Sequence, residues 1–394
     1  MKRHTSWMAA ALVAGGVLGA PAGASAVELG TIGDFKFWIG GYIKLDTLYT
    51  STSDGDIPGN SVGRDFYIPG TIPVGGGMSN DSLDFHAKES RINFKTAGTV
   101  GGMDITGFLE MDFQLPPGGD ERVSNSYNPR LRQAYIKVDN FLFGQTWSTF
   151  QNVGALAENL DFIGPAEGTI FIRQPLIRVS IGAFDLAVEN PETTVTPFGG
   201  GARIVTDDNV IPDFVGRFNV KIGEGGGQAS LAAMIRTLDC DGCAPGVNDR
   251  TTGYGLSAAV KLPIGDQGDD IRAMISWGDG LGRYIGVNTA NDAVIDASGD
   301  LETIGTLGGF VSLRHFWHPE WRSNLTLSGL KIDNDTALTG TGVTDRVYSV
   351  HANLIYQPIN IFSVGAEYMY ANRRIESGLS GNMHRIQFSA KLSI

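Results

Sequence analysis

Basic side chains recur on the polar faces of segments in which polar and apolar residues alternate. Arg91 and Lys95 share one face of such a segment, and Ile92 and Phe94 share the other. Guanidinium and ammonium groups that stand in water attract carboxylates and donate hydrogen bonds to them. These residue types at this spacing therefore predict a hydrated wall that favours anionic solutes. The alternative for any single arginine is pairing with a neighbouring acid.

The alternation conflicts with the residue type at two positions. Arg132 and Arg173 each share a face with β-branched apolar residues, so both would point to the apolar side. A bulge at Pro175 could switch the faces of the second segment, which keeps Arg173 and Arg178 both as candidates. The predicted basic wall residues are Arg91, Arg132, Arg173, Arg178, Arg217 and Arg236, and Arg272, Arg322, Arg385 and Lys391 also lie on polar faces.

The same alternation sets the fold class. Successive side chains of a β-strand point to opposite sides, so each segment needs water on one side and an apolar medium on the other. The gaps between segments alternate between long and short, as in outer-membrane barrels, and a soluble β-sandwich has no reason to keep this rhythm. We predict an all-β, 16-stranded antiparallel transmembrane β-barrel with strands at 35–50, 82–97, 103–115, 128–139, 141–147, 171–182, 184–190, 211–223, 227–239, 251–263, 269–279, 303–317, 320–332, 344–357, 360–373 and 382–394.

The N-terminus contains the parts of an export signal in order. Lys2 and Arg3 precede an apolar stretch at 7–18 that is too short to span a bilayer, and small residues suited to cleavage follow at 24–26. We interpret residues 1–26 as a cleaved signal peptide and residues 27–394 as a single transmembrane β-barrel domain in the bacterial outer membrane. No run of 18 apolar residues follows the signal, so the mature chain would cross the membrane as strands.

Composition excludes one class of partner. The mean hydropathy of −0.03 fits strands that are half polar. Once Lys2 and Arg3 are removed with the signal, 28 basic residues remain against 42 acidic ones, a net charge of −14. Binding to nucleic acid needs a cationic surface, so a nucleic-acid partner is excluded. The predicted partners are outer-membrane lipid and small hydrophilic solutes.

Two cysteines lie close together between two strand patterns. In an exported chain, Cys240 and Cys243 are predicted to form a local disulfide at a loop tip. A redox-active pair would need a helix N-terminus, and a zinc site would need further ligands nearby. Neither is found in the sequence, so no metal and no cofactor are predicted.

A membrane-embedded enzyme is the main rival class. His315 and His318 flank Phe316 and Trp317 at a strand end, and no nucleophile motif stands near them. Outer-membrane lipases and proteases could still carry a scattered serine, histidine and acid, and a closed structural or adhesive barrel is a third option. Small polar residues on the polar faces disfavour a filled lumen. We predict a channel without catalytic residues, and conductance in planar bilayers separates these classes.

A channel enclosed by 16 strands is wide and needs a constriction. The long segment 148–170 is the best candidate. Leu160 and Phe162 make it too apolar for a freely solvated loop, so we predict that it folds into the barrel. Its acids would then stand across the passage from wall arginines and set up a transverse field. The predicted acids of this constriction loop are Glu158, Asp161 and Glu167.

Several short stretches resemble the DcaP-like porin family. The run Gln-Thr-Trp-Ser-Thr-Phe at 145–150 and the step Arg-Gln-Pro at 173–175 are the more specific ones, and the likeness is sharpest over 85–191. The resemblance implies a homotrimeric 16-stranded outer-membrane porin with an inward-folded third loop, associated with uptake of small anionic compounds such as dicarboxylates. General diffusion porins are a more distant likeness, with wall arginines at positions similar to Arg91, Arg132 and Arg173. The final residue, Ile394, departs from the aromatic residue usual in such barrels.

Overall fold

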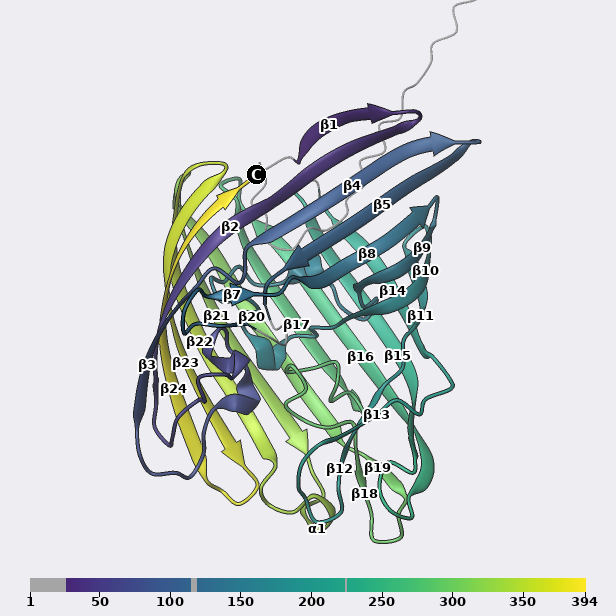
Figure 1. Ribbon diagram of the computed structural model, residues 1–394, viewed down its shortest axis with the longest axis vertical. Helices are drawn as coiled ribbons and strands as arrows, with labels where there is room; N and C mark the ends of the chain where they lie inside the picture. Colours follow the sequence, from purple (N-terminus) through teal and green to yellow (C-terminus); the bar gives the residue numbers. More distant parts are fainter. Residues whose placement is uncertain (1–25, 115–118, 224) are drawn as a thin grey trace, which may run out of the picture.

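The computed structural model describes residues 26–114, 119–223 and 225–394, so nearly all of the predicted signal peptide lies outside the described residues. The wall is a closed antiparallel barrel of 16 strands, which confirms the predicted fold class (Figure 1). Around the barrel these are β2 (Phe35–Thr52), β3 (Asn80–His86) together with β4 (Arg91–Val100), β5 (Met103–Asp112), β8 (Arg130–Val138), β9 (Phe141–Trp147), β10 (Arg173–Ile181), β11 (Phe184–Glu189), β14 (Asp213–Ile222), β15 (Gly227–Asp241), β16 (Asn248–Ile264), β17 (Asp269–Asp279), β20 (Gly305–His318), β21 (Trp321–Asp333), β22 (Thr344–Ile359), β23 (Phe362–Ile375) and β24 (Ser380–Ser393).

The first and last wall strands close the barrel. β2 pairs with β24 from Tyr42 opposite Ser393 to Thr52 opposite Met383. On its other edge β2 pairs with β4 and then with β3. Residues 87–90 interrupt this neighbour, so the single strand predicted at 82–97 is two strands. A further short strand that was not predicted, β1 (Val27–Ile32), pairs with the beginning of β2.

The connections differ in length at the two ends of the barrel. Tight turns such as Gly101 and Gly102, between β4 and β5, lie at the top of Figure 1 together with β1 and the C-terminus. Both glycines have positive φ, at 59° and 85°, which favours glycine in such a turn. We call this the turn end. The long connections lie at the opposite end, which we call the loop end.

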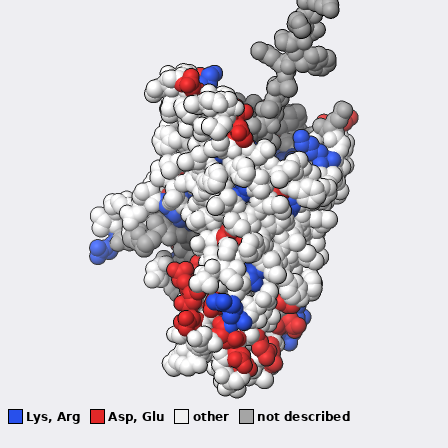
Figure 2. All heavy atoms as spheres, turned by 90° about the vertical axis from the view of Figure 1, so that its right-hand side faces the viewer, with Lys and Arg blue, Asp and Glu red and all other residues white. Residues whose placement is uncertain are grey.

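The two faces of each wall strand differ in polarity. On β24, Phe388 is 57% exposed on the outer face, whereas Arg385 and Gln387 point inward and are buried. An outward charge at mid-depth in a bilayer would cost about 2 to 4 kcal/mol, which is why the outer face is apolar. Figure 2 shows a mostly uncharged belt between the ends, with acidic side chains gathered at the loop end.

Two of the predicted loops contain additional strands. Segments 191–210 and 280–302 form a small sheet at the loop end, in which Val195 of one connection pairs in parallel with Ala293 of the other. These strands are only three or four residues long, so they leave no alternation that a sequence pattern could detect. They are β12 (Thr193–Thr196), β13 (Ile204–Thr206), β18 (Ala293–Ile295) and β19 (Leu301–Thr303), and β6 (Gly119–Asp120) pairs with β7 (Ser126–Tyr127) in a separate hairpin.

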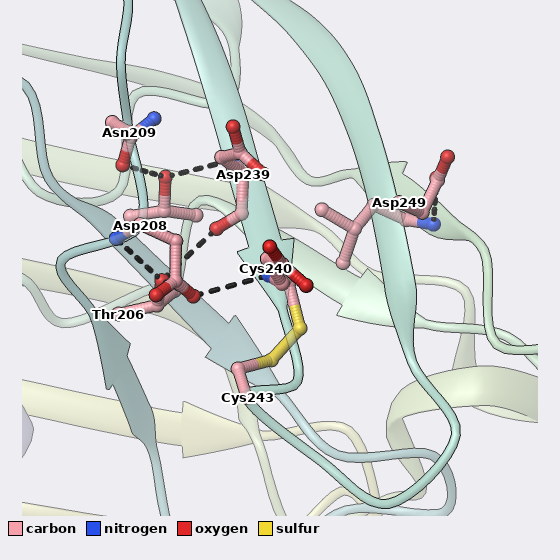
Figure 3. The surroundings of a disulfide bond; sticks show 10 residues. Thr206, Asp208, Asn209, Asp239, Cys240, Cys243 and Asp249 are labelled. Atoms are coloured by element: carbon pink, nitrogen blue, oxygen red, sulfur yellow. Dashed lines mark hydrogen bonds between the residues drawn. A yellow bond between two sulfur atoms is a disulfide. The ribbon is translucent and has the colours of Figure 1, made fainter.

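The disulfide lies where the β15–β16 hairpin meets this small sheet (Figure 3). Cys240 and Cys243 are bonded, with their Cα atoms 5.2 Å apart. Thr206 Oγ1 donates to the backbone oxygen of Asp239, and the backbone N–H of Asp241 donates to Asp208 at 3.1 Å. The disulfide therefore pins a hairpin tip that holds the small sheet in place.

Much of the barrel interior is packed rather than open. Phe150 and Tyr284, from two different loop-end connections, pack against inward residues of the wall such as Phe310. Phe66 and Ile163 pack in a second buried cluster beside β23 and β24. The described residues include no helix long and apolar enough to cross a membrane. The short helical turns are η1 (Val62–Arg64), η2 (Pro69–Thr71), η3 (Val153–Ala155), η4 (Ala166–Gly168) and α1 (Thr336–Thr339).

Candidate functional site

The connection between β9 and β10, residues 148–172, lies inside the barrel and packs against its wall. We call it the inner loop. The backbone N–H of Ser148 donates to the carbonyl of Ile172 at 3.1 Å, which brings the two ends of the loop together. Gly168 approaches the wall so closely that a Cβ there would lie 2.3 Å from the backbone oxygen of Gly309 on β20. The inner loop is therefore seated directly on the strands.

Glu158 fastens the inner loop to β20 and β21. Its Oε1 accepts a hydrogen bond from Nη2 of Arg322 at 2.7 Å, and its Oε2 lies 3.4 Å from Nη1 of Arg314. Its backbone oxygen accepts from Nδ2 of Asn353 on β22 at 2.9 Å. This acid touches the wall arginines directly instead of facing them across open water.

Asp161 joins the inner loop to a second connection that enters the barrel. Its carboxylate accepts the backbone N–H groups of Tyr67 at 2.8 Å and of Ile163 and Gly164 at 3.0 Å each. Hydrogen bonds to a charged acceptor contribute about 1.5 to 3 kcal/mol each. Because Tyr67 belongs to residues 53–79 between β2 and β3, this one side chain orders both connections.

Arginines on β4 and β8 form a cluster beside the inner loop. Arg132 donates to Glu110 at 2.8 Å and to Asp112 at 2.7 Å. Arg130 binds Asp112 through two hydrogen bonds of 2.8 Å, and Arg91 lies 3.7 Å from Glu110. Glu110 and Asp112 are 1% and 0% exposed. The buried acids hold the guanidinium groups in fixed positions on the wall.

Two lysines complete this side of the lumen. Lys44 on β2 forms an ion pair with Glu89 and donates to the backbone oxygen of Leu160 in the inner loop at 2.7 Å. Lys391 on β24 places its ammonium 4.0 Å from the centre of the Tyr42 ring. Both lysines are thus held by aromatic or acidic neighbours at the closing seam of the barrel.

These groups surround a cavity of about 430 Å³ between the inner loop and the wall. Among the described residues that line it, eight are basic and three are acidic, so positive charge prevails at its surface. No group of three or more His, Cys, Asp or Glu side chains in the described part of the chain is placed to hold a metal ion. The basic residues are Lys44, Arg91, Arg132, Lys261, Arg272, Arg314, Arg322 and Lys391, and the acids are Glu89, Glu158 and Asp161.

Residues 35–183 match the family of the DcaP outer membrane protein. This part of the chain is similar to that family. The fold of the chain is similar to the crystal structure of the outer membrane channel DcaP of Acinetobacter baumannii, with a TM-score of 0.76 and 22% identity over 91% of this chain and 97% of that one. Among curated proteins, no sequence matches it significantly.

The barrel of this chain is also similar to those of more distant porins. An anion-selective porin from Comamonas acidovorans gives a TM-score of 0.57 at 10% identity, over 91% of this chain and 100% of that one. OmpF of Salmonella typhi gives 0.57 at 13% identity, over 92% and 100%. These likenesses show the shared barrel fold.

The alternation pattern gives the wrong face for Arg132. Glu110 pairs with Gln133, but the next residue, Met111, pairs with Leu131, so Arg132 is an extra residue in β8. Such a bulge turns two consecutive side chains to the same side. Arg132 is consequently 1% exposed and points inward, although its neighbours along the strand suggested the lipid face.

The two candidates on β10 have different positions. No bulge occurs at Pro175, because β10 pairs with β9 without a shift from Arg173 to Val179. Arg173 stacks on Trp147, with 4.5 Å between its guanidinium carbon and the ring centre. Arg178 points inward and donates to Thr149 Oγ1 at 2.8 Å, at the start of the inner loop. Neither belongs to the cavity lining, and both support the loop that forms it.

Three other predicted site residues also lie away from the cavity. Arg217 donates to the backbone oxygen of Gln151 and so holds the start of the inner loop. Arg236 is 1% exposed and lies 2.8 Å from Asp292, below the small sheet at the loop end. Glu167 is fully buried under the wall. These positions assign packing roles to Arg217 and Arg236, which alternation placed on the pore wall, and to Glu167, which was predicted as an acid of the constriction loop.

The cavity also includes basic residues that were not among the predicted candidates. Lys44 and Arg314 stand on inward faces of β2 and β20, and Lys261 stands on the inward face of β16. The alternation of Lys44 with Asp46 and of Arg314 with Ser312 would have found the first two. Nothing in the sequence indicates that these three reach the same cavity, because only barrel closure and the inner loop bring them together.

The Glu158 contact predicts a specific pH dependence of the channel. Burial opposes ionisation of this carboxyl, but the guanidinium groups of Arg322 and Arg314 outweigh burial and lower its pKa from 4.5 to about 2. The ion pair is then fully present above pH 4.5 and is lost as the pH falls through about 2. We expect single-channel conductance to stay constant from pH 7 to 4, whereas Glu158→Gln shows at pH 7 the noisier current of an unfastened loop. A transition of the unmodified channel centred near pH 5 would contradict this assignment.

Proposed function

We propose that this protein is an outer-membrane porin that favours small anionic solutes, with dicarboxylates as the best-suited class. The observation behind this proposal is the cavity, whose described lining residues include eight basic side chains and three acidic ones. Charged groups that line a narrow aqueous passage select ions of opposite sign. The proteins that the chain resembles are channels, so we propose solute passage rather than catalysis as its activity.

The orientation of the groups matters more to this proposal than their number. Four further acids, Asp46, Glu110, Asp112 and Asp270, hold the basic groups from behind and nearly balance their charge. All four carboxylates are buried in the wall, at 0% or 1% exposure. Four of the basic residues, Lys261, Arg272, Arg314 and Lys391, are by contrast partly exposed. A passing solute therefore meets guanidinium and ammonium donors more readily than the compensating carboxylates behind them. We expect a moderate anion preference that weakens with added salt.

The basic groups occupy two separate arcs of the wall. Lys44, Arg91 and Lys391 stand on the neighbouring strands β2, β4 and β24. A second group, Arg272, Arg314 and Arg322, stands on β17, β20 and β21, and strands β22 and β23 separate the two arcs. A solute with one carboxylate at each end can contact both arcs at once, which favours dicarboxylates over monocarboxylates of similar size.

Reversal potential in a potassium chloride gradient tests the anion preference. The purified protein in a planar bilayer is expected to give the sign of an anion-selective channel at 0.1 M salt or below, where the Debye length is about 10 Å or more. Flux into liposomes then compares dicarboxylates with monocarboxylates of equal length. Cation selectivity at low salt would overturn the proposal, and equal flux of both acids would restrict it to anions in general.

We also propose a homotrimer, on the basis of the family match and of the porin fold. The outer faces of β2, β4, β5, β8 and β9 carry a shallow apolar groove that includes Phe94, Leu109 and Phe143. Such a face can be covered by a neighbouring subunit as well as by lipid. Native mass measurement after mild detergent extraction tests the assembly, and a monomer that retains full conductance would contradict it.

A further inference from the structure

Three aromatic rings stand on the inner face of the wall near the turn end, where they are out of place in a polar lumen. Strand pairing puts Trp38 opposite Lys95, Lys95 opposite Phe108, and Phe108 opposite Tyr135. Residues that face each other in paired strands lie on the same side of a sheet. The four side chains therefore form one row across β2, β4, β5 and β8. We call it the aromatic row.

The inward direction of the row follows from residues already placed. Arg91 lines the cavity, and Lys95 lies four residues further along the same strand, hence on the same face. Ile39 and Phe94 pair on the opposite face, where Phe94 is 40% exposed on the outside of the barrel. The aromatic row is thus distinct from the aromatic girdle that membrane barrels present to lipid.

The rings contact one another and their basic neighbour. The centres of the Phe108 and Tyr135 rings are 5.4 Å apart, and the ammonium of Lys95 lies 5.2 Å from the centre of the Trp38 ring. Gly144 lies opposite Tyr135 on β9, and a Cβ there would lie 2.3 Å from the backbone oxygen of Ala134, so β8 and β9 approach each other closely at this end of the row. All three rings are only partly buried, and Lys95 is exposed.

The row lies between the cavity and the turn end of the barrel. Lys95 lies four residues beyond Arg91 on β4, which is about 13 Å along the strand in the direction of the turn end. Lys137 follows on the inner face one step further along β8, opposite Thr106. At the same end of other wall strands the inward positions include the polar Asn219 and Gln228 and one further ring, Phe316, which lies beside Arg314 and Arg322. The aromatic row differs from these positions in joining three rings and a lysine across four neighbouring strands.

We propose that the aromatic row is a binding site for flat aromatic carboxylates. Partly exposed rings in water gain by offset stacking with a planar solute. Ring faces alone repel an anion, but Lys95 within the row and Lys137 beside it supply the charge that the carboxylate needs. This site goes beyond the anion preference of the cavity, because it distinguishes anions by shape and not by charge, and it rests on the proposed passage of anions to the turn end.

Benzoate and cyclohexanecarboxylate are the decisive probes, because they share charge and size but only benzoate has a flat aromatic ring. We expect benzoate, added on the turn side of the unmodified channel in a bilayer, to reduce the chloride current at concentrations about 3-fold or more below those needed for cyclohexanecarboxylate. Trp38→Leu combined with Phe108→Leu should remove this difference, and Phe94→Leu on the outer face of β4 should keep it.

The outcomes separate this inference from the proposed function. Equal block by the two probes in the unmodified channel would overturn the aromatic site without any variant having to fold. A difference that persists in the Trp38→Leu, Phe108→Leu variant would also overturn it. Anion selectivity is measured on the same membranes by reversal potential, so its failure would count against the cavity proposal and not against the row.

Discussion

Replacing Arg91 and Lys391 together by alanine is expected to lower the anion preference of the channel strongly while leaving the barrel folded. Both side chains line the cavity, on strands that flank the closing seam. A unit charge some 7 Å from a passing ion contributes about 0.6 kcal/mol in water, and screening at 0.1 M salt reduces this by about half. Because the charge attracts the anion and repels the cation, each loss should reduce the anion to cation permeability ratio by about two- to three-fold at this salt concentration. Reversal potential at several salt concentrations measures the change.

The fold should survive because the buried acid next to Arg91 keeps its stronger partner. Glu110 still accepts from Arg132 at 2.8 Å and from Gln133 at 3.2 Å after Arg91 is removed. Arg250→Ala is the matched control, since this arginine pairs with Asp239 near the loop end and does not line the cavity. An unchanged reversal potential in the double variant, or an equal change in the control, would refute the role of the cavity in selectivity.

Asp112→Ala is expected to be the most destabilising single substitution near the constriction. The carboxylate is fully buried and holds two guanidinium groups, Arg130 through a bidentate contact and Arg132 at 2.7 Å. Removing one partner from a buried ion pair leaves an uncompensated charge, which costs about 3 to 5 kcal/mol. Urea unfolding of the barrel in lipid vesicles, followed by tryptophan fluorescence, measures the loss.

Two further variants define the origin of this effect. Asp104→Ala lies on the same strand but is exposed and has no arginine partner, so it should change the free energy of unfolding by less than about 0.5 kcal/mol. Adding Arg130→Met to Asp112→Ala should recover part of the lost stability, because it removes a guanidinium that has lost its carboxylate partner, while Arg132 still pairs with Glu110 at 2.8 Å. A loss in Asp112→Ala no larger than in Asp104→Ala would rule out the ion-pair explanation.

The positions of the predicted acids illustrate where reasoning from the sequence stops. The apolar residues of 148–170 correctly indicated a segment that leaves the solvent, and the structure packs Phe162 with its ring centre 5.1 Å from that of Phe66. The sequence did not indicate which groups the three acids of this segment contact. Asp161 binds backbone N–H groups, Glu158 binds Arg322 across 164 positions of the chain, and Glu167 is buried. Such contacts depend on loop packing, which carries no periodic signal.

By itself the sequence determined the barrel, its strand number and the face of most wall residues. This is possible because side chains alternate between the two faces within each strand, so the residue types of one segment are enough to indicate which face is in water and which is in an apolar medium. Tertiary structure alone decided which inward residues meet at one place. The bulge at Arg132 shifts a register that only its pairing with β5 defines. Likewise, Lys44 and Arg314 line one cavity because barrel closure and the inner loop bring distant strands together. Contacts of that kind depend on residues far apart in the chain, where no local period can report them.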